Sequence, residues 1–320
     1  MPKRHASAET NRSQVIADAD NGEKERRMQQ ITAIGFDLFD TLITLQNLGY
    51  QEATDRLVHG LHAQELVVEK EAFLSIYRDT AHQFMTAARS DHKETHNRYW
   101  ISAALHQSGH AVPPDDSRVT HAVEAYFSAF VDHAALLPKT LEMLAALKGR
   151  YRLGLLSNFT HPPAVYEMMS RFGLDAYLDV QLVSGDLGYR KPHGRVFEAL
   201  SEQFGVPADQ IAFVGDDLDA DVHGARAAGL HPIRTIYAEA YKAALTTDVP
   251  PRPGDNPDPP VWRRIGQRAA STDHAEHDAS NSQVNTIASW DDLLALLDIP
   301  PNTALAGGKL DAAPKVLDAE

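Results

Sequence analysis

Short apolar runs alternate with amphipathic segments along most of this 320-residue chain. Bounded apolar runs of this kind predict buried strands. We place them at 31–37, 151–158, 180–184, 211–214 and 232–237. Between them, apolar residues recur every three or four positions, which predicts helices. Alternation of strands and helices indicates the α/β class, with a doubly wound parallel sheet and helices on both faces.

The stretch 45–137 departs from this alternation, because its apolar residues keep helical spacing throughout, as over 73–84 and 119–131. A further helix is predicted over 92–108. This helical stretch is too long for a loop, and it follows the carboxyl end of the first strand. We therefore predict a second, α-helical cap domain that covers that end of the sheet.

Three segments fall outside both patterns. Residues 1–29 are polar and aperiodic, which predicts a disordered tail. Residues 244–284 are rich in proline, which sustains neither helix nor strand, so we expect an exposed and mostly disordered insertion. Residues 299–320 form a polar tail. The predicted α/β core therefore comprises 30–44 and 138–298.

Composition narrows the classes of function. The chain has no cysteine, so a bound metal would have oxygen or nitrogen ligands. A formal net charge of −14 argues against a nucleic-acid partner, but not against a small anionic substrate near a lysine and a metal. No apolar run approaches the ~18 residues that span a bilayer, and the N-terminus lacks a signal-peptide core. We expect a cytoplasmic protein with no membrane partner, and the oligomeric state stays open.

Polar residues gather at the predicted strand ends, where open α/β sheets bind ligands. Four motifs carry them in the order IGFDLFDTL, YRLGLLSN, SGDLGYRKP and IAFVGDDLDADVHGARAAG. Capping residues, a surface lysine and a solvated acidic loop would explain each motif alone. Their joint occurrence favours a catalytic site. The residues concerned are Asp37, Ser157, Asn158, Lys191, Asp216, Asp217 and Asp221.

These four motifs resemble those of the haloacid dehalogenase-like hydrolase superfamily, in its subgroup with a helical cap inserted after the first motif. The resemblance covers about 31–229, with a last strand and helix expected over 285–297. It implies a Rossmann-like core of five main strands in which the strand that ends at Asp37 is central.

The resemblance also implies a covalent mechanism and a metal. Asp37 would be the nucleophile that attacks phosphorus or an activated carbon. Mg²⁺ would bind the Asp37 carboxylate, the Phe39 backbone carbonyl and Asp216, since this ion prefers oxygen ligands. Asp221, or less readily Asp217, would be the second acid, which binds the ion through water or holds the catalytic lysine.

Three further side chains complete the implied site. Lys191 would neutralise the nucleophile and the substrate oxygens as a point charge. Ser157 would donate a hydrogen bond to a phosphoryl oxygen, and Thr41 would support the first-motif loop beside the substrate. Backbone amides would complete the phosphate cradle, at Leu38, Phe39 and Asn158.

Phe39 departs from the family pattern. Phosphatases of this superfamily usually have an aspartate there, which protonates the leaving group. Such a group typically contributes about 10²–10⁴-fold to the rate. We therefore expect selectivity for leaving groups that need no proton, such as aryl or acyl phosphates. Asp40, one residue later, is an alternative acid.

The main prediction is a Mg²⁺-dependent phosphatase that hydrolyses a small phosphate ester through an aspartyl-phosphate intermediate. Two other functions stay open. Haloacid dehalogenases also have an aromatic residue at position 39, but they use no metal and usually have serine-type residues in the fourth motif. This chain keeps Gly215-Asp216-Asp217, and packed carboxylates need a cation. The sequence therefore favours the phosphatase. Phe39 alone supports a third function, non-catalytic binding of a phospho-ligand.

Two histidine signals are weaker. His92 and His96 are four residues apart in a predicted helix, the spacing that places two metal ligands on one face. With 16 histidines in the chain, a surface role is the simpler explanation. His193, two residues after Lys191, is a candidate proton donor at the mouth of the site.

Overall fold

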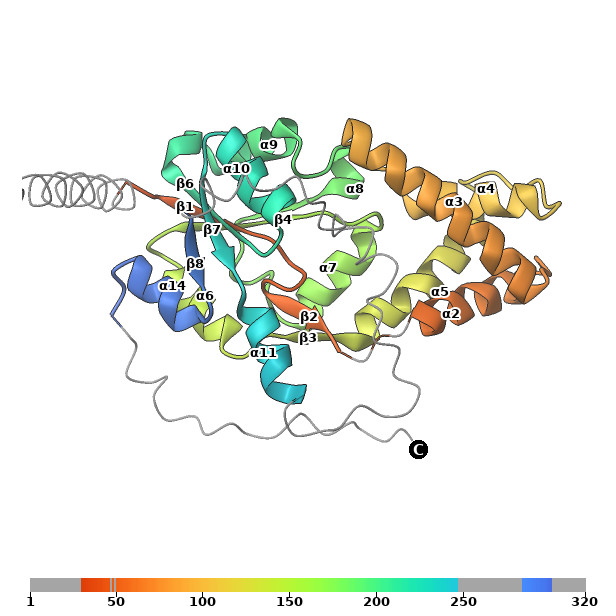
Figure 1. Ribbon diagram of the computed structural model, residues 1–320, viewed down its shortest axis with the longest axis horizontal. Coiled ribbons are helices and arrows are strands. Elements are labelled where there is room, and N and C mark those ends of the chain that lie inside the picture. Colours follow the sequence, from red (N-terminus) through yellow and green to blue (C-terminus); the bar gives the residue numbers. More distant parts are fainter. Residues whose placement is uncertain (1–29, 47, 49, 247–283, 301–320) are drawn as a thin grey trace, which may run out of the picture.

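A computed structural model describes residues 30–300 apart from 47, 49 and 247–283. Its core is a six-stranded parallel sheet in the order β5-β4-β1-β6-β7-β8 (Figure 1). This architecture confirms the predicted α/β class, and β8 is the last strand that we expected within 285–297, beside the five main strands. The strands are β1 (Ala33–Phe36), β4 (Arg152–Ser157), β5 (Val180–Val183), β6 (Ile211–Gly215), β7 (His231–Thr235) and β8 (Asn285–Ile287).

Strand β1 is buried on both faces, because helices cover each side of the sheet. Ile34 and Phe36 belong to the apolar cluster formed with α6 (Thr140–Leu147), α7 (Pro162–Arg171) and α14 (Trp290–Leu296). The opposite face packs on α9 (Gly194–Phe204) and α10 (Gly224–Ala227). A Cβ at Gly35 would lie 2.8 Å from Leu200 of α9 and from Phe213, so a larger residue there would push the helix away.

Four helices lie together beyond one end of the sheet (Figure 1). They are α2 (Tyr50–Ala63), α3 (Lys70–Asp91), α4 (Asn97–Gln107) and α5 (Ser117–His133). Strands β2 (Ile43–Leu45) and β3 (Ala134–Leu136), which sequence patterns did not predict, pair antiparallel and carry the chain to and from these helices. One apolar cluster continues from the sheet face into the four helices. We refer to α2–α5 as the cap.

The predicted helix over 92–108 is wrong at its start. His92 has φ 53°, in the left-handed region, and follows the end of α3. His96 precedes α4 and its ring accepts a hydrogen bond from the Arg98 amide. The pair therefore does not lie on one helix face, and the hypothesis of two metal ligands fails. Residues 92–94 instead bond to the core, as described below.

Shorter elements complete the core: α8 (Ser184–Leu187), the 3₁₀ turn η1 (Ala208–Gln210), the π-helix η2 (Leu218–His223) and α11 (Tyr237–Thr246). Helix α11 includes the first residues of the predicted insertion, while 247–283 and both tails lie outside the described residues. Ile299, which we placed at the start of a polar tail, is buried in the core. Within the part of the chain that the structure describes, no helix is long and apolar enough to cross a membrane.

Candidate functional site

Asp37 directly follows the central strand β1. Its backbone amide donates to the Val214 carbonyl at 2.9 Å and thereby extends the ladder between β1 and β6. Its carboxylate is nearly buried, with the residue 8% exposed. A buried carboxylate needs a charged partner, and Lys191 Nζ donates to Asp37 Oδ1 at 2.6 Å. The motif aspartate and the motif lysine, which are far apart in sequence, therefore meet at one strand end.

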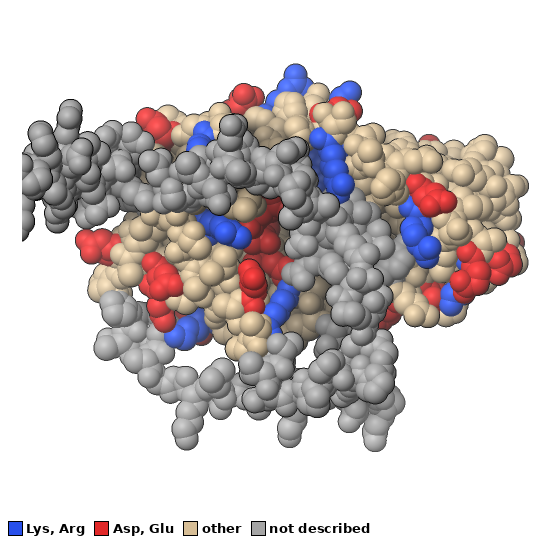
Figure 2. Space-filling view, viewed as in Figure 1, with Lys and Arg blue, Asp and Glu red and all other residues tan. Residues whose placement is uncertain are grey.

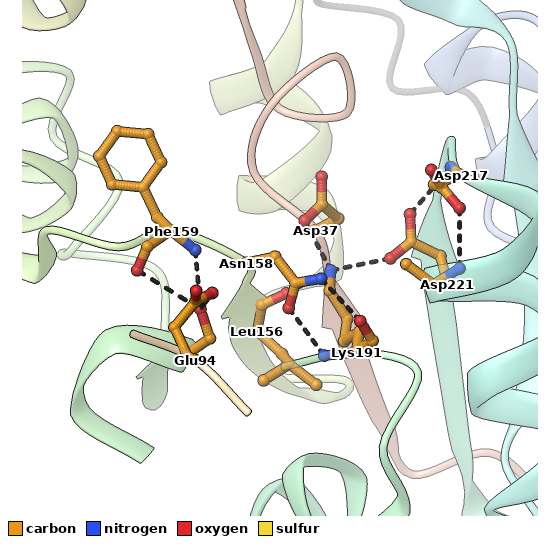
Figure 3. A network of polar contacts seen from close by, with 10 residues as sticks. Asp37, Glu94, Leu156, Asn158, Phe159, Lys191, Asp217 and Asp221 are labelled. Atoms are coloured by element: carbon orange, nitrogen blue, oxygen red, sulfur yellow. Dashed lines mark hydrogen bonds and ion pairs between the residues drawn. The ribbon is translucent and has the colours of Figure 1, made fainter. Parts of the chain in front are cut away.

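The Lys191 ammonium contacts three oxygen acceptors (Figure 3). Besides Asp37, it lies 2.8 Å from Asp221 Oδ1 and 2.7 Å from the Leu156 carbonyl oxygen. The contacts with Asp37 and Leu156 are hydrogen bonds, and the contact with Asp221 is an ion pair. The Phe213 ring lies 5.1 Å from the same nitrogen. The buried charge of Lys191 is therefore compensated by two carboxylates and one backbone carbonyl.

Asn158 holds the backbone of Lys191. Its side-chain amide donates to the Lys191 carbonyl at 2.9 Å, and its Oδ1 accepts from the Lys191 amide at 2.8 Å. We expected Asn158 to contribute to substrate binding through its backbone. Its side chain has a second task that the sequence did not indicate, because it fixes the loop before α9 against the end of β4.

Asp216 and Asp221 join Asp37 in a cluster of carboxylates that lie within 4.8 Å of one another. Asp221 packs on Gly215, where a Cβ would lie only 2.3 Å from its carboxyl carbon, so the motif requires glycine. Asp217 instead caps η2, with its carboxylate accepting from the amides at 219 and 220. The geometry therefore selects Asp221, and not Asp217, as the second acid beside the lysine.

Burial and mutual repulsion govern the electrostatics of this charged centre, which we define as Asp37, Lys191, Asp216 and Asp221. Burial raises the pKa of Asp37 while Lys191 lowers it, and burial raises the pKa of Asp221 to about 7 against the same lysine. Burial, followed by the charges of Asp221 and Asp37, raises the pKa of Asp216 well above its ordinary value. For Lys191, burial opposes the charge, but the two carboxylates raise its pKa.

The charged centre fits a divalent cation. Three carboxylates and one ammonium leave a formal charge of −2, and every available ligand atom is oxygen, as Mg²⁺ prefers. Figure 2 shows acidic side chains gathered in a hollow near the middle of this face, with basic side chains around it. A small anionic substrate would meet a repulsive field here unless a cation offsets it.

Two hydroxyls near the strand ends have no partner within the described residues. Ser157 and Thr41 are fully buried, and neither Oγ nor Oγ1 makes a hydrogen bond to that part of the chain. A buried polar group without a partner costs about 1–3 kcal/mol. Ser157 follows Leu156, whose carbonyl accepts from the lysine, so its unpartnered hydroxyl lies at the same strand end as Lys191.

The Asp40 carboxylate is engaged by two side chains of the core. Its backbone is left-handed, with φ 57°. Its Oδ1 accepts from Thr44 at 2.7 Å and from Lys242 of α11 at 2.5 Å. An ion pair favours the ionised carboxylate, which makes proton donation harder. Lys242 was missed because it belongs to no motif and reaches the first-motif loop from a late helix.

Phe39 connects this loop to the cap. Its ring stacks on Phe159 with centroids 5.0 Å apart, and Phe159 in turn lies 5.1 Å from Phe127 and 5.9 Å from Phe130 of α5. Phe159 comes directly after the second motif, so its position could have signalled a role. We call this group the aromatic contact.

The histidines of the sequence analysis have structural partners. The Nδ1 atom of His161 lies 3.2 Å from Nε2 of His96, across the boundary between core and cap. Burial lowers the pKa of both histidines to about 4. His193 caps α9, with its Nδ1 accepting from the Arg195 amide at 3.2 Å. That bond uses Nδ1 to cap the helix, and the role of His193 as a proton donor stays a prediction.

Comparisons with known proteins agree with the motifs. A family profile described as haloacid dehalogenase-like hydrolase matches residues 31–229. Haloacid dehalogenase-like hydrolase domain-containing protein 3 of Mus musculus is 28% identical over 230 residues, covering 69% of this chain and 88% of its own length. Ribulose-1,5-bisphosphate 5-phosphatase of Halopiger xanaduensis is 29% identical over 232 residues, covering 68% and 90%. The crystal structure of 2-haloacid dehalogenase from Pseudomonas syringae pv. Tomato DC3000 shares the fold, with a TM-score of 0.51, 20% identity, and coverage of 84% of this chain and 98% of that one.

Proposed function

The chain belongs to the haloacid dehalogenase-like hydrolase family, and we propose that it is a Mg²⁺-dependent phosphatase that acts on a small phosphorylated molecule. The observation that carries the proposal is the buried charged centre, in which a strand-end aspartate contacts a lysine beside two more carboxylates. The relative from Halopiger, whose name describes a sugar bisphosphate phosphatase, supports this substrate class.

In the proposed reaction, one Asp37 oxygen attacks the phosphorus atom while the bond from phosphorus to the leaving-group oxygen breaks. The result is an aspartyl phosphate at Asp37 and a released oxyanion. Water then attacks the phosphorus while the bond from phosphorus to the Asp37 oxygen breaks, which restores the carboxylate and releases phosphate that carries the protons of the water. Lys191 holds the nucleophile in place and offsets charge on the phosphoryl oxygens, and Ser157 donates its hydroxyl to one of them.

The metal would be held by Asp37, Asp216, the Phe39 carbonyl and, directly or through water, Asp221. When bound, Mg²⁺ supplies positive charge that reduces the repulsion between an anionic nucleophile and an anionic phosphoryl group. Hydrogen bonds within the chain orient two of these carboxylates. Lys191 orients Asp37, and the Asp217 amide orients Asp221 through a 3.0 Å bond to its Oδ2.

Phe39 restricts which leaving groups can depart. With an apolar ring two residues after the nucleophile and with Asp40 paired to Lys242, no acid of the first-motif loop is placed to protonate the leaving oxygen. We therefore propose that aryl and acyl phosphates, whose leaving groups are stable anions, are turned over faster than alkyl phosphates. Phe39 also favours a second candidate, a metal-independent 2-haloacid dehalogenase, in which Asp37 attacks a carbon and expels halide.

A screen with the purified protein separates the two candidates. Phosphate esters and 2-haloacids are offered with Mg²⁺ and after exhaustive chelation, with Asp37→Asn as the control. The phosphatase proposal predicts phosphate release that needs Mg²⁺ and disappears in the variant. Halide release that survives chelation would replace it with the dehalogenase.

A further inference from the structure

The connection between α3 and α4 is bonded to the core segment that leads to Lys191. Lys93 and Tyr189 form an antiparallel bridge. The Arg190 amide donates to the His92 carbonyl at 2.9 Å, and the Glu94 amide donates to the Gly188 carbonyl at 3.0 Å. A short stretch of the cap thus pairs, strand-like, with residues 188–190.

Glu94 places a carboxylate inside this junction. Its side chain is only 1% exposed, although it belongs to a connection between cap helices. Ser184 Oγ donates to Glu94 Oε2 at 2.7 Å, and the same Oγ accepts from the Phe159 amide at 2.8 Å. Its Oε1 accepts from the Thr95 amide at 3.3 Å and lies 3.7 Å from Arg190 Nη1. Burying a carboxylate with such limited compensation is costly, so its position calls for a reason.

Glu94 reaches both loops that carry site residues. Through Ser184 it holds the Phe159 amide, one residue beyond Asn158, which clamps the Lys191 backbone. Through its backbone and Arg190 it holds the residues that immediately precede the lysine. Figure 3 shows Glu94 beside Phe159, on the far side of Asn158 from Asp37. The carboxylate contacts no member of the charged centre, so it can act only by positioning others.

We propose that Glu94 is a positioning residue that couples seating of the cap to the placement of Lys191 and Ser157. The proposal rests on the proposed function for its catalytic readout. When the cap is seated, the bonds of Glu94 fix both loops. When the cap moves away, Glu94 leaves Ser184 and residues 188–190 lose their strand-like partner. The active arrangement is then assembled only in the closed molecule, which also excludes water.

Glu94→Ala and Ser184→Ala test this coupling, alone and combined, with Glu124→Ala on the exposed side of α5 as the matched control. Displacement of catalytic groups by about 1 Å can cost roughly 10²-fold in rate. We expect each variant to lower kcat about 10- to 100-fold while KM changes less than kcat, and the double variant to add little. Glu94→Gln, which keeps an acceptor for Ser184, should restore most of kcat.

Hydrogen exchange supplies a readout that does not depend on turnover. The amides of Arg190 and Glu94 should exchange faster in Glu94→Ala and in Ser184→Ala than in Glu124→Ala, while amides of β1 and β6 stay protected. Unchanged protection at these amides, or a kcat equal to that of the control in folded Ser184→Ala, would overturn the proposal. Retained turnover in Asp37→Asn would instead overturn the proposed function and leave the exchange result standing.

Discussion

The charged centre and the aromatic contact lie at the two ends of one short loop, yet they are built differently. In the charged centre, groups from separate core segments meet at 2.6–2.8 Å and carry opposite charges. In the aromatic contact, rings from core and cap approach to 5.0–5.9 Å and carry none. Buried charge pairs are short and directional, whereas ring contacts hold their partners by apolar burial and by the preferred geometry of aromatic pairs. The charged residues of the proposed reaction therefore all belong to the core, whereas the aromatic contact joins the core to the cap.

The largest effect is expected at the lysine of the charged centre. Lys191→Met removes the only ammonium that contacts Asp37 and Asp221 among the described residues, and should lower kcat by at least ~10³-fold. Loss of one partner of a buried pair should also destabilise the fold by about 3–5 kcal/mol. Kinetics at saturating substrate and denaturant unfolding measure both. Lys139→Met, which breaks an exposed ion pair with Asp291, is the control and should change neither. A Lys191 variant as active as this control would show that the reaction does not need the lysine of the charged centre.

The next effect concerns Phe39, the member of the aromatic contact that lies two residues after Asp37. Phe39→Asp restores a carboxyl group where the family phosphatases have their acid, and should raise the rate on alkyl phosphates by about 10²-fold. Aryl phosphates, which need no proton donor, should change much less. The plot of rate against leaving-group pKa should therefore become flatter. Phe39→Asn, which opens the aromatic contact equally but adds no acid, is the matched control. An equal gain in both variants would show that ring removal, and not acid catalysis, causes the change.

A third test removes one carboxylate from the charged centre. Mg²⁺ should raise the unfolding midpoint of the native protein, because a ligand of the folded state stabilises it by about 2.7 kcal/mol at 100 times its Kd. Asp216→Asn should abolish this shift. Asp219→Asn, an exposed aspartate of the same loop, should retain it. Calorimetry with and without the ion gives the answer, and an intact Mg²⁺ shift in Asp216→Asn would remove that residue from the metal site.

The smallest effect is expected at the histidine pair of the cap boundary. The pKa of His161 in the fold is lowered to about 4 by burial and then by His96, which itself faces Arg98 and Asp186. The unfolded chain, with an ordinary pKa near 6.5, binds more protons between these values, so this contribution is present above about pH 6.5 and is lost as the pH falls toward 4. Because the His161 side chain is not fully buried, we expect its contribution to the free energy of unfolding to change by only about 1–2 kcal/mol over this range. Unfolding free energies of His161→Gln from pH 4 to 7 should slope less steeply. The same slope as the native protein would contradict this assignment.

Sequence was a good guide to the core because three of the candidate site residues lie at the ends of apolar runs, at predictable places. Asp37 ends β1, Ser157 ends β4, and Asp216 follows β6, so parallel pairing alone brings them to one edge. The choice between Asp217 and Asp221 needed the path of η2, which decides which carboxylate turns toward the lysine.

The boundary between core and cap was harder to predict, because its contacts obey no periodicity. The polar run around Glu94 fits a helix by composition, and only its bonds to residues 188–190 explain why α3 ends before it. Lys242 likewise depends on where α11 lies over the first-motif loop. Contacts of this kind come from tertiary packing between distant segments, and no single motif encodes them.

The most direct test looks for the bond that the account requires. The native protein is quenched in acid during turnover of an aryl phosphate with Mg²⁺, and the peptide that contains Asp37 is weighed by mass spectrometry. We expect the added mass of one phosphoryl group on Asp37, its loss on treatment with hydroxylamine, and its absence from Asp37→Asn. Turnover of the same substrate with no adduct at Asp37 and with no loss of rate in Asp37→Asn would contradict it.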